Sequence, residues 1–362
     1  MAAGEPVTAL LLGGGAPTLT LQSGALAALH EHGVKFDIIS TAGAGMLIGL
    51  LYAAPKGLSP AQALAQTKEM GVHDSIYEHF PINFKVFHKP GNLADGYRRW
   101  LQSLPRMVPG QAEASRLWAD WMALMHATLC PSDLGMQSLG LCDHAPWIDE
   151  VVDFDKLKEF KGEFYMNAYC IDEQKMHIFD KHQITPDHFR ASLAFPLIYP
   201  PFELNGKTYI EGSAIDTLCF EGVLNYYDRR VQKKERLEPI DQIVIFDVLS
   251  AKQIIRKPTS LYDAWVQSIM IPLVEIAKDD IELFKYRYKD RWADKWGKDG
   301  EGFLLQVNFG ELIPAQHWPK VLDWSYSNLS TLYDVGYEAG QRFFERNRDR
   351  LKTKAPAPGV AA

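Results

Sequence analysis

The chain has 362 residues, of which 47% are apolar and 23% are charged. This composition is typical of a globular protein with a large core, and it excludes a disordered or collagen-like chain. The net charge of −7, from 38 Lys and Arg against 45 Asp and Glu, argues against nucleic acid as a partner.

The first 71 residues alternate between the patterns of strands and helices. We predict strands at Val7–Leu12 and Phe36–Ile39, and helices at Leu19–His32, at Met46–Ala54 and from Ser59 to about Gly71. Glycines interrupt the two long uncharged runs in this region, which we therefore interpret as buried core and not as membrane spans. The alternation predicts a parallel sheet covered by helices on both faces.

The remainder of the chain divides into segments that differ in residue composition and in hydrophobic pattern. We predict a core over residues 5–250 that includes a helical insertion at about 76–157 and further strands at Phe164–Ile171 and Gln242–Val248. A C-terminal helical extension follows over residues 251–350, and a Pro- and Ala-rich tail, predicted to be disordered, over 352–362. All nine Trp fall in the two helical additions, so we expect them to cover a site or contact a partner and not to form the core.

The cellular compartment is predicted from the cysteines and the N-terminus. The four cysteines are widely spaced and lack metal-type motifs, which favours reduced thiols in a cytoplasmic protein. The first residues lack the basic segment and long apolar stretch of a secretory signal peptide.

A glycine-rich turn, Gly13–Gly14–Gly15, separates the first predicted strand from the first helix. Backbone N–H groups and the positive end of the helix converge at such a turn, which can hold a phosphate or an oxyanion. Thr18 stands where a dinucleotide-binding fingerprint needs its third glycine, and no GK[ST] follows. A merely structural tight turn is the alternative interpretation.

A second turn, Thr41–Gly45, joins the second predicted strand to the second helix. Its small residues are typical of a nucleophile elbow, in which G-x-S-x-G exposes a serine on strained backbone. The central residue here is Gly43, which relieves the strain but offers no nucleophile.

A third region contains ASLAFP at residues 191–196, YPP at 199–201 and NGKTYIEGS at 205–213. With the two turns, it resembles the patatin-like phospholipases, whose motifs are a Gly-rich oxyanion loop, G-x-S-x-G, ASxAxPxxFPP and GxxYxDGG. The resemblance covers most of residues 5–56 and 160–250. It implies a three-layer α/β fold with a mostly parallel central sheet, and hydrolysis of lipid acyl esters by a Ser–Asp dyad.

The resemblance also assigns site residues. The nucleophile position falls on Gly43 and the base position on Glu211, while Gly13, Gly14, Gly15 and Ala44 are the oxyanion or ligand-binding candidates. Pro17 and Thr18 replace the basic residue and glycine that usually follow in the loop. Loss of the serine is expected to reduce standard hydrolysis by about 10⁴–10⁶-fold.

Three functions remain open from the sequence. The first is binding of an acyl or lipid-like ligand without hydrolysis. The second is hydrolysis with Glu211 as general base on a water and the loop amides as the oxyanion hole. The third is a structural or scaffolding role.

Several further side chains are secondary candidates. Ser40, Ser23 and Ser192 are possible displaced nucleophiles, each with a packing role as the alternative. Asp216 is a candidate substitute acid, or else caps a turn.

We predict no metal and no cofactor. In particular, we expect no partnering acidic cluster for His177, His182 and His188, which are spaced through loops and a strand.

The segment Leu117–Leu129 predicts an amphipathic helix. Leu117, Trp121, Leu124 and Met125 fall on one face of it. Such a face suits a lid over an acyl tunnel, a peripheral membrane contact, internal packing or a homo-oligomer contact.

Overall fold

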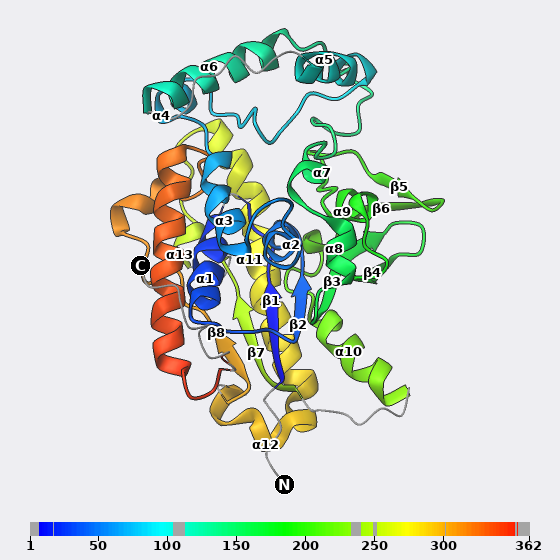
Figure 1. The fold of residues 1–362 in the computed structure, drawn as a ribbon, viewed down its shortest axis with the longest axis vertical. Helices are drawn as coiled ribbons and strands as arrows, with labels where there is room; N and C mark the ends of the chain where they lie inside the picture. The colour runs from blue at the N-terminus through cyan, green and yellow to red at the C-terminus, as the bar shows by residue number, and fades with distance from the viewer. Residues whose placement is uncertain are drawn as a thin grey trace.

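The computed structural model describes residues 7–16, 18–103, 113–232, 240–248, 252–300, 302–351 and 353. The predicted disordered tail therefore lies, apart from Thr353, outside the described residues. An eight-stranded sheet forms the centre of the molecule, in the order β5-β6-β3-β2-β1-β7-β8 with β4 beside β3 (Figure 1). Its strands are β1 (Val7–Leu12), β2 (Ile38–Thr41), β3 (Glu163–Cys170), β4 (Lys175–Asp180), β5 (Phe202–Leu204), β6 (Lys207–Glu211), β7 (Ile240–Phe246) and β8 (Leu304–Gln306).

The middle of the sheet is parallel and one edge is antiparallel. The neighbours β3-β2-β1-β7-β8 all run in parallel, whereas β4 and β6 pair antiparallel with β3, and β5 antiparallel with β6. The predicted three-layer α/β fold with a mostly parallel sheet is confirmed.

Helices cover both faces of the sheet, as alternate residues of β1 show. Leu10 and Leu12 belong to a hydrophobic cluster with α1, α2 and α13, while Ala9 and Leu11 belong to a second cluster with α10 and the end of α11. The α-helices are α1 (Leu19–Glu31), α2 (Gly45–Ala53), α3 (Pro60–Ala65), α4 (Asp74–Tyr77), α5 (Asn92–Ser103), α6 (Glu113–Leu129), α7 (Ile148–Val151), α8 (Phe154–Lys158), α9 (Pro186–Ser192), α10 (Phe220–Gln232), α11 (Leu261–Tyr288), α12 (Ala293–Trp296) and α13 (Tyr326–Asn347).

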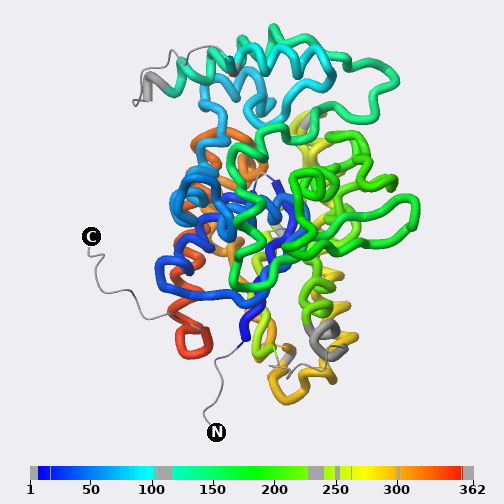
Figure 2. The backbone as a smooth tube through the Cα atoms, turned by 45° about the vertical axis from the view of Figure 1, so that its right-hand side comes forward, coloured from blue at the N-terminus to red at the C-terminus, as the bar shows by residue number. Residues whose placement is uncertain are grey.

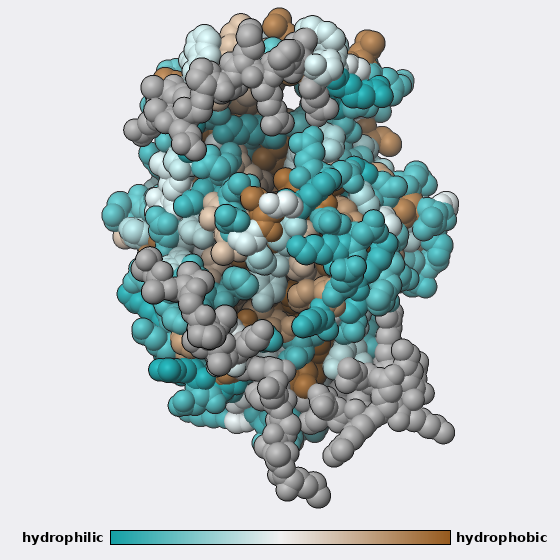
Figure 3. All heavy atoms as spheres, in the orientation of Figure 1, coloured by the Kyte–Doolittle hydropathy of each residue, from teal (hydrophilic) through white to brown (hydrophobic). Residues whose placement is uncertain are grey.

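The predicted helical insertion forms an arm, defined here as α4, α5 and α6 with the described residues between α4 and α5. The arm lies across the top of the molecule in both backbone views, beyond the ends at which β1 and β2 finish (Figures 1 and 2). Atoms of hydrophobic residues gather on the arm and in the hollow beneath it (Figure 3).

The C-terminal extension is more closely integrated than predicted. It contributes β8 to the sheet, and α13 packs along α1. Trp318 and Trp324 belong to the main hydrophobic cluster, and Trp292 belongs to the second one. The expectation that the Trp residues lie outside the core is therefore wrong for these three, because the extension itself completes the core.

Candidate active site

The glycine-rich turn begins where β1 ends, and its first two amides have acceptors within the protein. The N–H of Gly13 donates to the carbonyl of Phe246 at 3.3 Å, and the N–H of Gly14 donates to the carbonyl of Thr217 at 3.1 Å. Gly15 is half-buried with φ +125°, a conformation that favours glycine. Among the described residues, the N–H of Gly15 donates to no acceptor in the protein.

The second turn places Gly43 between β2 and α2 with φ +50°, in the left-handed region. The N–H of Ala42 donates to the carbonyl of Leu12, so the turn lies directly beside the end of β1. No acceptor within the described part of the protein bonds the N–H of Ala44, the residue before the first turn of α2. Helix N-termini attract negative charge, so Ala44 and Gly15 are the two candidate oxyanion donors with free N–H groups.

Glu211 is the last residue of β6 and is 6% exposed. Its N–H donates to the carbonyl of Ala194 at 3.0 Å, which fixes the strand end against the ASLAFP segment. Burial raises the pKa of Glu211 to about 8, and a hydrogen bond from Ser213 partly opposes that increase. The carboxyl group is therefore mostly protonated at neutral pH.

Gly43 and Glu211 lie together, as the resemblance implies. A Cβ built on Gly43 would lie 2.5 Å from Glu211 Oε1 and 2.5 Å from Ser213 Oγ. A Cβ built on Gly14 would lie 3.1 Å from the same Ser213 Oγ. The space beside Gly43 is thus filled by two polar side chains: that of Glu211, at the end of β6, and that of Ser213, two residues later.

Ser213 is the site residue that the sequence interpretation missed. Its hydroxyl donates to Glu211 Oε1, and the residue is 3% exposed. The signal was present, because Ser213 stands at the last glycine of the GxxYxDGG pattern. Its meaning depends on three-dimensional proximity to residue 43, which the pattern alone does not give.

The other serine candidates have different surroundings. Ser40 Oγ donates to the carbonyl of Cys219 at 2.7 Å, and the side chain is completely buried. Ser23 in α1 and Ser192 in α9 are also completely buried, and no hydrogen bond satisfies their hydroxyls within the described part of the protein.

Asp216 serves the turn after Glu211. Its Oδ1 accepts the N–H of Cys219 at 2.8 Å and of Leu218 at 3.4 Å. Burial and the neighbouring Asp280 raise the pKa of Asp216 to about 7. This geometry matches the turn-capping alternative, and the structure gives Asp216 no hydrogen bond to Glu211.

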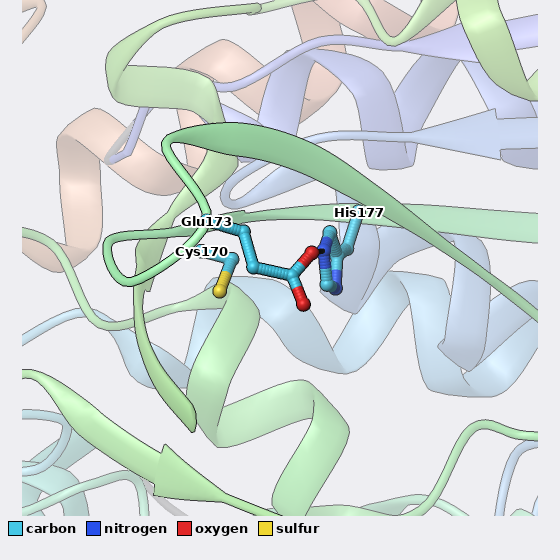
Figure 4. A group of neighbouring side chains, drawn as sticks. All are labelled: Cys170, Glu173 and His177. Carbon is cyan, nitrogen blue, oxygen red and sulfur yellow. Dashed lines mark hydrogen bonds and ion pairs between the residues drawn. The ribbon is translucent and has the colours of Figure 1, made fainter. Parts of the chain in front are cut away.

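One group of side chains among the described residues has ligand atoms spaced closely enough for a metal ion: Cys170, Glu173 and His177 (Figure 4). His177 Nε2 lies 2.9 Å from Glu173 Oε2, so the expectation that this histidine lacks an acidic partner is wrong. The acid comes from the tight β3–β4 turn. Glu173 also pairs with Lys175 and Lys207, and these hydrogen bonds lower its pKa to about 2. Two ammonium groups already neutralise the single carboxylate, which explains the cluster as an ion-pair network.

The side chains of the predicted apolar face of α6 have two different environments in the structure. Leu117 and Leu124 pack against the main hydrophobic cluster, whereas Trp118, Trp121 and Met125 are 61%, 44% and 50% exposed. The exposed side chains lie on the arm. Within the described residues, no helix has the length and hydropathy required to cross a membrane.

The comparison with protein families agrees with the motifs. The family model described as patatin-like phospholipase matches residues 10–224, more than half of the chain. Among solved structures, the crystal structure of VipD from Legionella pneumophila is similar with a TM-score of 0.41 and 12% sequence identity. That similarity covers 95% of this chain and 67% of the VipD chain. No curated protein gives a significant match.

Proposed function

We propose that this chain, which belongs to the patatin-like phospholipase family, hydrolyses lipid acyl esters without a serine at the elbow, with Glu211 as the proton acceptor. The observation that carries the proposal is the position of Glu211: its carboxyl oxygen reaches to 2.5 Å from the point where a side chain at residue 43 would begin. An ionised carboxylate at that point can accept the proton of a nucleophile that attacks an acyl carbon beside the elbow.

The pKa of the acid supports this role. A general base works best when its pKa lies near the operating pH, and enzymes reach that range for Glu by burial. Burial raises the pKa of Glu211 to about 8, far above the range of an exposed Glu. A minority of the carboxyl groups are ionised at neutral pH, and these are more basic than an exposed Glu carboxylate.

Two free amides support the electrostatic part of the reaction. The N–H groups of Gly15 and Ala44 belong to the two turns that border Gly43 and Ser213. The negative oxygen of a tetrahedral intermediate needs such donors, and each is worth about 10²–10³-fold in rate when it is well placed.

The test is hydrolysis of a panel of short- and long-chain acyl esters by the purified protein and by Glu211→Gln. The variant keeps the shape of the side chain but cannot accept a proton, so we expect turnover to fall at least ~100-fold. Glu203→Gln is the matched control, because Glu203 is an exposed acid on the neighbouring strand β5. Equal turnover by wild type and Glu211→Gln would refute the role of Glu211.

A second candidate function is retention of an acyl or lipid-like ligand without hydrolysis. The observation that favours it is the glycine at the elbow, which carries no nucleophile. Two surface hollows of the structure lie away from Gly43 and Glu211. One is lined by residues of α13 and by residues at and after the end of β8, and the other by residues between Asp133 and Ser138. A protein that turns over no ester and copurifies with a fatty acid supports this second function, and one that does neither supports a scaffolding role.

A further inference from the structure

The place of the missing elbow hydroxyl is occupied by another hydroxyl. Ser213 Oγ lies 2.5 Å from the Cβ position built on Gly43. A serine side chain at residue 43 would carry its own Oγ one bond beyond that Cβ. The hydroxyl of Ser213 therefore lies 2.5 Å from the point where an elbow side chain would begin, in the space that such a side chain would fill.

We propose that Ser213 is the nucleophile of this site and that Glu211 is its base, so that the catalytic hydroxyl comes from the β6 loop and not from the elbow. The proposal rests on the hydrolysis proposed above and names the group that attacks the ester. In the patterns quoted for the family, residue 43 is the serine and residue 213 is a glycine. This chain carries the two residues exchanged.

The hydrogen bonding of Ser213 has the direction that nucleophilic attack requires. Its hydroxyl donates to Glu211 Oε1, so the proton already points to the acid that would receive it. The lone pairs of Ser213 Oγ remain available, because no donor among the described residues bonds to this oxygen.

The exchange is sterically consistent on both sides. Ser213 fits only because residue 43 has no side chain, since any Cβ there would also lie 2.9 Å from Ser213 Cβ. Gly14 is equally confined, because its own Cβ would approach Ser213 Cβ to 3.0 Å. Two glycines thus make the space that the Ser213 side chain occupies.

The pair lies just beneath the surface. Ser213 is 3% exposed, but the neighbouring Ala214 is half-buried and Ile215 is 45% exposed. On the opposite side, Gly15 is half-buried and Ala16 is exposed.

The reaction balances with water as the only co-reactant. Ser213 Oγ bonds to the acyl carbon while its proton passes to ionised Glu211. The ester C–O bond then breaks, and the leaving alcohol takes that proton from Glu211. In the second half, Glu211 removes a proton from water, the water oxygen bonds to the acyl carbon, and the Ser213–acyl bond breaks as Ser213 Oγ recovers the proton. The products are a carboxylic acid and an alcohol.

The test is covalent labelling of the full chain with a fluorophosphonate probe, followed by intact-mass analysis and peptide mapping, in parallel with the ester panel. We expect one adduct, mapped to Ser213, and loss of both the adduct and at least ~100-fold of the turnover in Ser213→Ala. Ser40→Ala and Ser192→Ala are the control variants, because both hydroxyls are buried outside the pair, and both are expected to label normally.

A third variant guards against a folding defect in Ser213→Ala. Ser213→Cys retains a nucleophilic atom at the same position. We expect it to accumulate an acyl adduct, a thioester, that hydroxylamine releases. If Ser213 only satisfies the buried Glu211, neither the wild type nor this variant forms an acyl adduct.

The outcomes separate the two proposals. Ester turnover that persists in Ser213→Ala without any adduct on the wild type overturns the role of Ser213 but leaves Glu211 acting on water. An adduct mapped to another serine also overturns it. Absence of both turnover and adduct in the wild type overturns the hydrolase function itself.

Discussion

Gly43 limits how the proposed catalytic groups can be arranged in this protein. It has a positive φ of +50° and two polar side chains where its own would be. A single reversion to serine therefore does not recreate the usual elbow. The two residues that contact this position must change together with it.

We expect Gly43→Ser to destabilise the fold by about 1–3 kcal/mol, because its Cβ collides with Ser213 and its backbone is left-handed. Ser213→Gly removes the collision with Ser213, but neither the close approach to Glu211 Oε1 nor the backbone strain. In the double variant the cost of the serine is smaller, so the two substitutions couple favourably. Urea unfolding of the four proteins measures this coupling. If the changes in the free energy of unfolding add exactly, the side chains of residues 43 and 213 do not compete for the same volume.

The activity is expected to depend on pH through Glu211. Since only ionised Glu211 accepts a proton and burial raises its pKa to about 8, kcat/KM rises about tenfold per pH unit below that value and is level above it. The profile of kcat/KM on one ester against pH is the measurement. A profile that is flat between about pH 6 and pH 9 contradicts the assignment.

The same logic predicts the effect of removing the Ser213 hydroxyl on Glu211. The hydrogen bond from Ser213 lowers the pKa of Glu211, so Ser213→Ala raises that pKa further. Titration of the carboxyl group by carbon-detected NMR or difference infrared spectroscopy checks the direction. A decrease would mean that the hydroxyl does not donate to the carboxylate in solution.

At the scale of elements, the close packing of α1 on α13 depends on glycine. A Cβ built on Gly336 would lie 2.7 and 2.8 Å from backbone carbon atoms of Leu21, and one built on Gly340 would lie 2.8 Å from Ala25 Cα. Backbone atoms cannot rotate away as a side chain can. The distance between the two helices is therefore set by residues without side chains.

We expect Gly336→Ala to destabilise the protein by about 1–3 kcal/mol through this overpacking. Gly96→Ala is the matched control: it lies in α5, is exposed, and has nothing within 4 Å of its Cβ position. There the higher helix propensity of Ala should stabilise the protein by up to about 1 kcal/mol. Thermal or urea unfolding compares the two, and equal effects would contradict the packing argument.

The sequence predicted those elements whose burial is complete. β1 and β7 are almost completely buried and contain the apolar runs 9–12 and 243–246, from which their type follows; β7 begins and ends two residues earlier than the predicted Gln242–Val248. β4 is mostly half-exposed, while β5 and β8 have only three residues each, so no periodic pattern marks them. These short strands were missed for that reason.

The site was predictable where it is local in sequence. That Gly43 and Glu211 lie together could be predicted, because each stands at a fixed place in a short motif of the family. The importance of Ser213 depends on pairing between distant strands: β6 pairs with β3, and β3 pairs with β2, which leads directly into Gly43. No short pattern contains that information.

At the scale of the whole molecule, buried acids make stability depend on pH. Burial raises the pKa of Glu211 to about 8, that of Asp216 to about 7 and that of Asp323 to about 6. In the unfolded chain these groups lose their protons at lower pH than in the folded one. Their stabilising contribution is therefore complete in acid and declines as pH rises through these values.

We expect the protein to be more stable near pH 6 than near pH 8, with Glu211 contributing about 2 kcal/mol of the difference. Urea unfolding at both values tests this prediction, with Glu211→Gln as the reference, since an amide at that position does not titrate. The pH difference should be smaller in the variant. An identical difference would assign the effect to other groups.

The pairing of α1 with α13 has a consequence for biosynthesis. The first helix of the chain finds its partner more than 290 residues later, and β8 joins the sheet only after Leu304. When residues 10–224 have emerged from the ribosome, every motif of the family has been synthesised. At that stage α13 does not yet exist, so the apolar surface of α1 that α13 covers in the folded protein is still exposed. In the nascent chain, the apolar face of α1 therefore stays uncovered until α13 has been synthesised. We expect a chaperone to bind this face of α1 during translation.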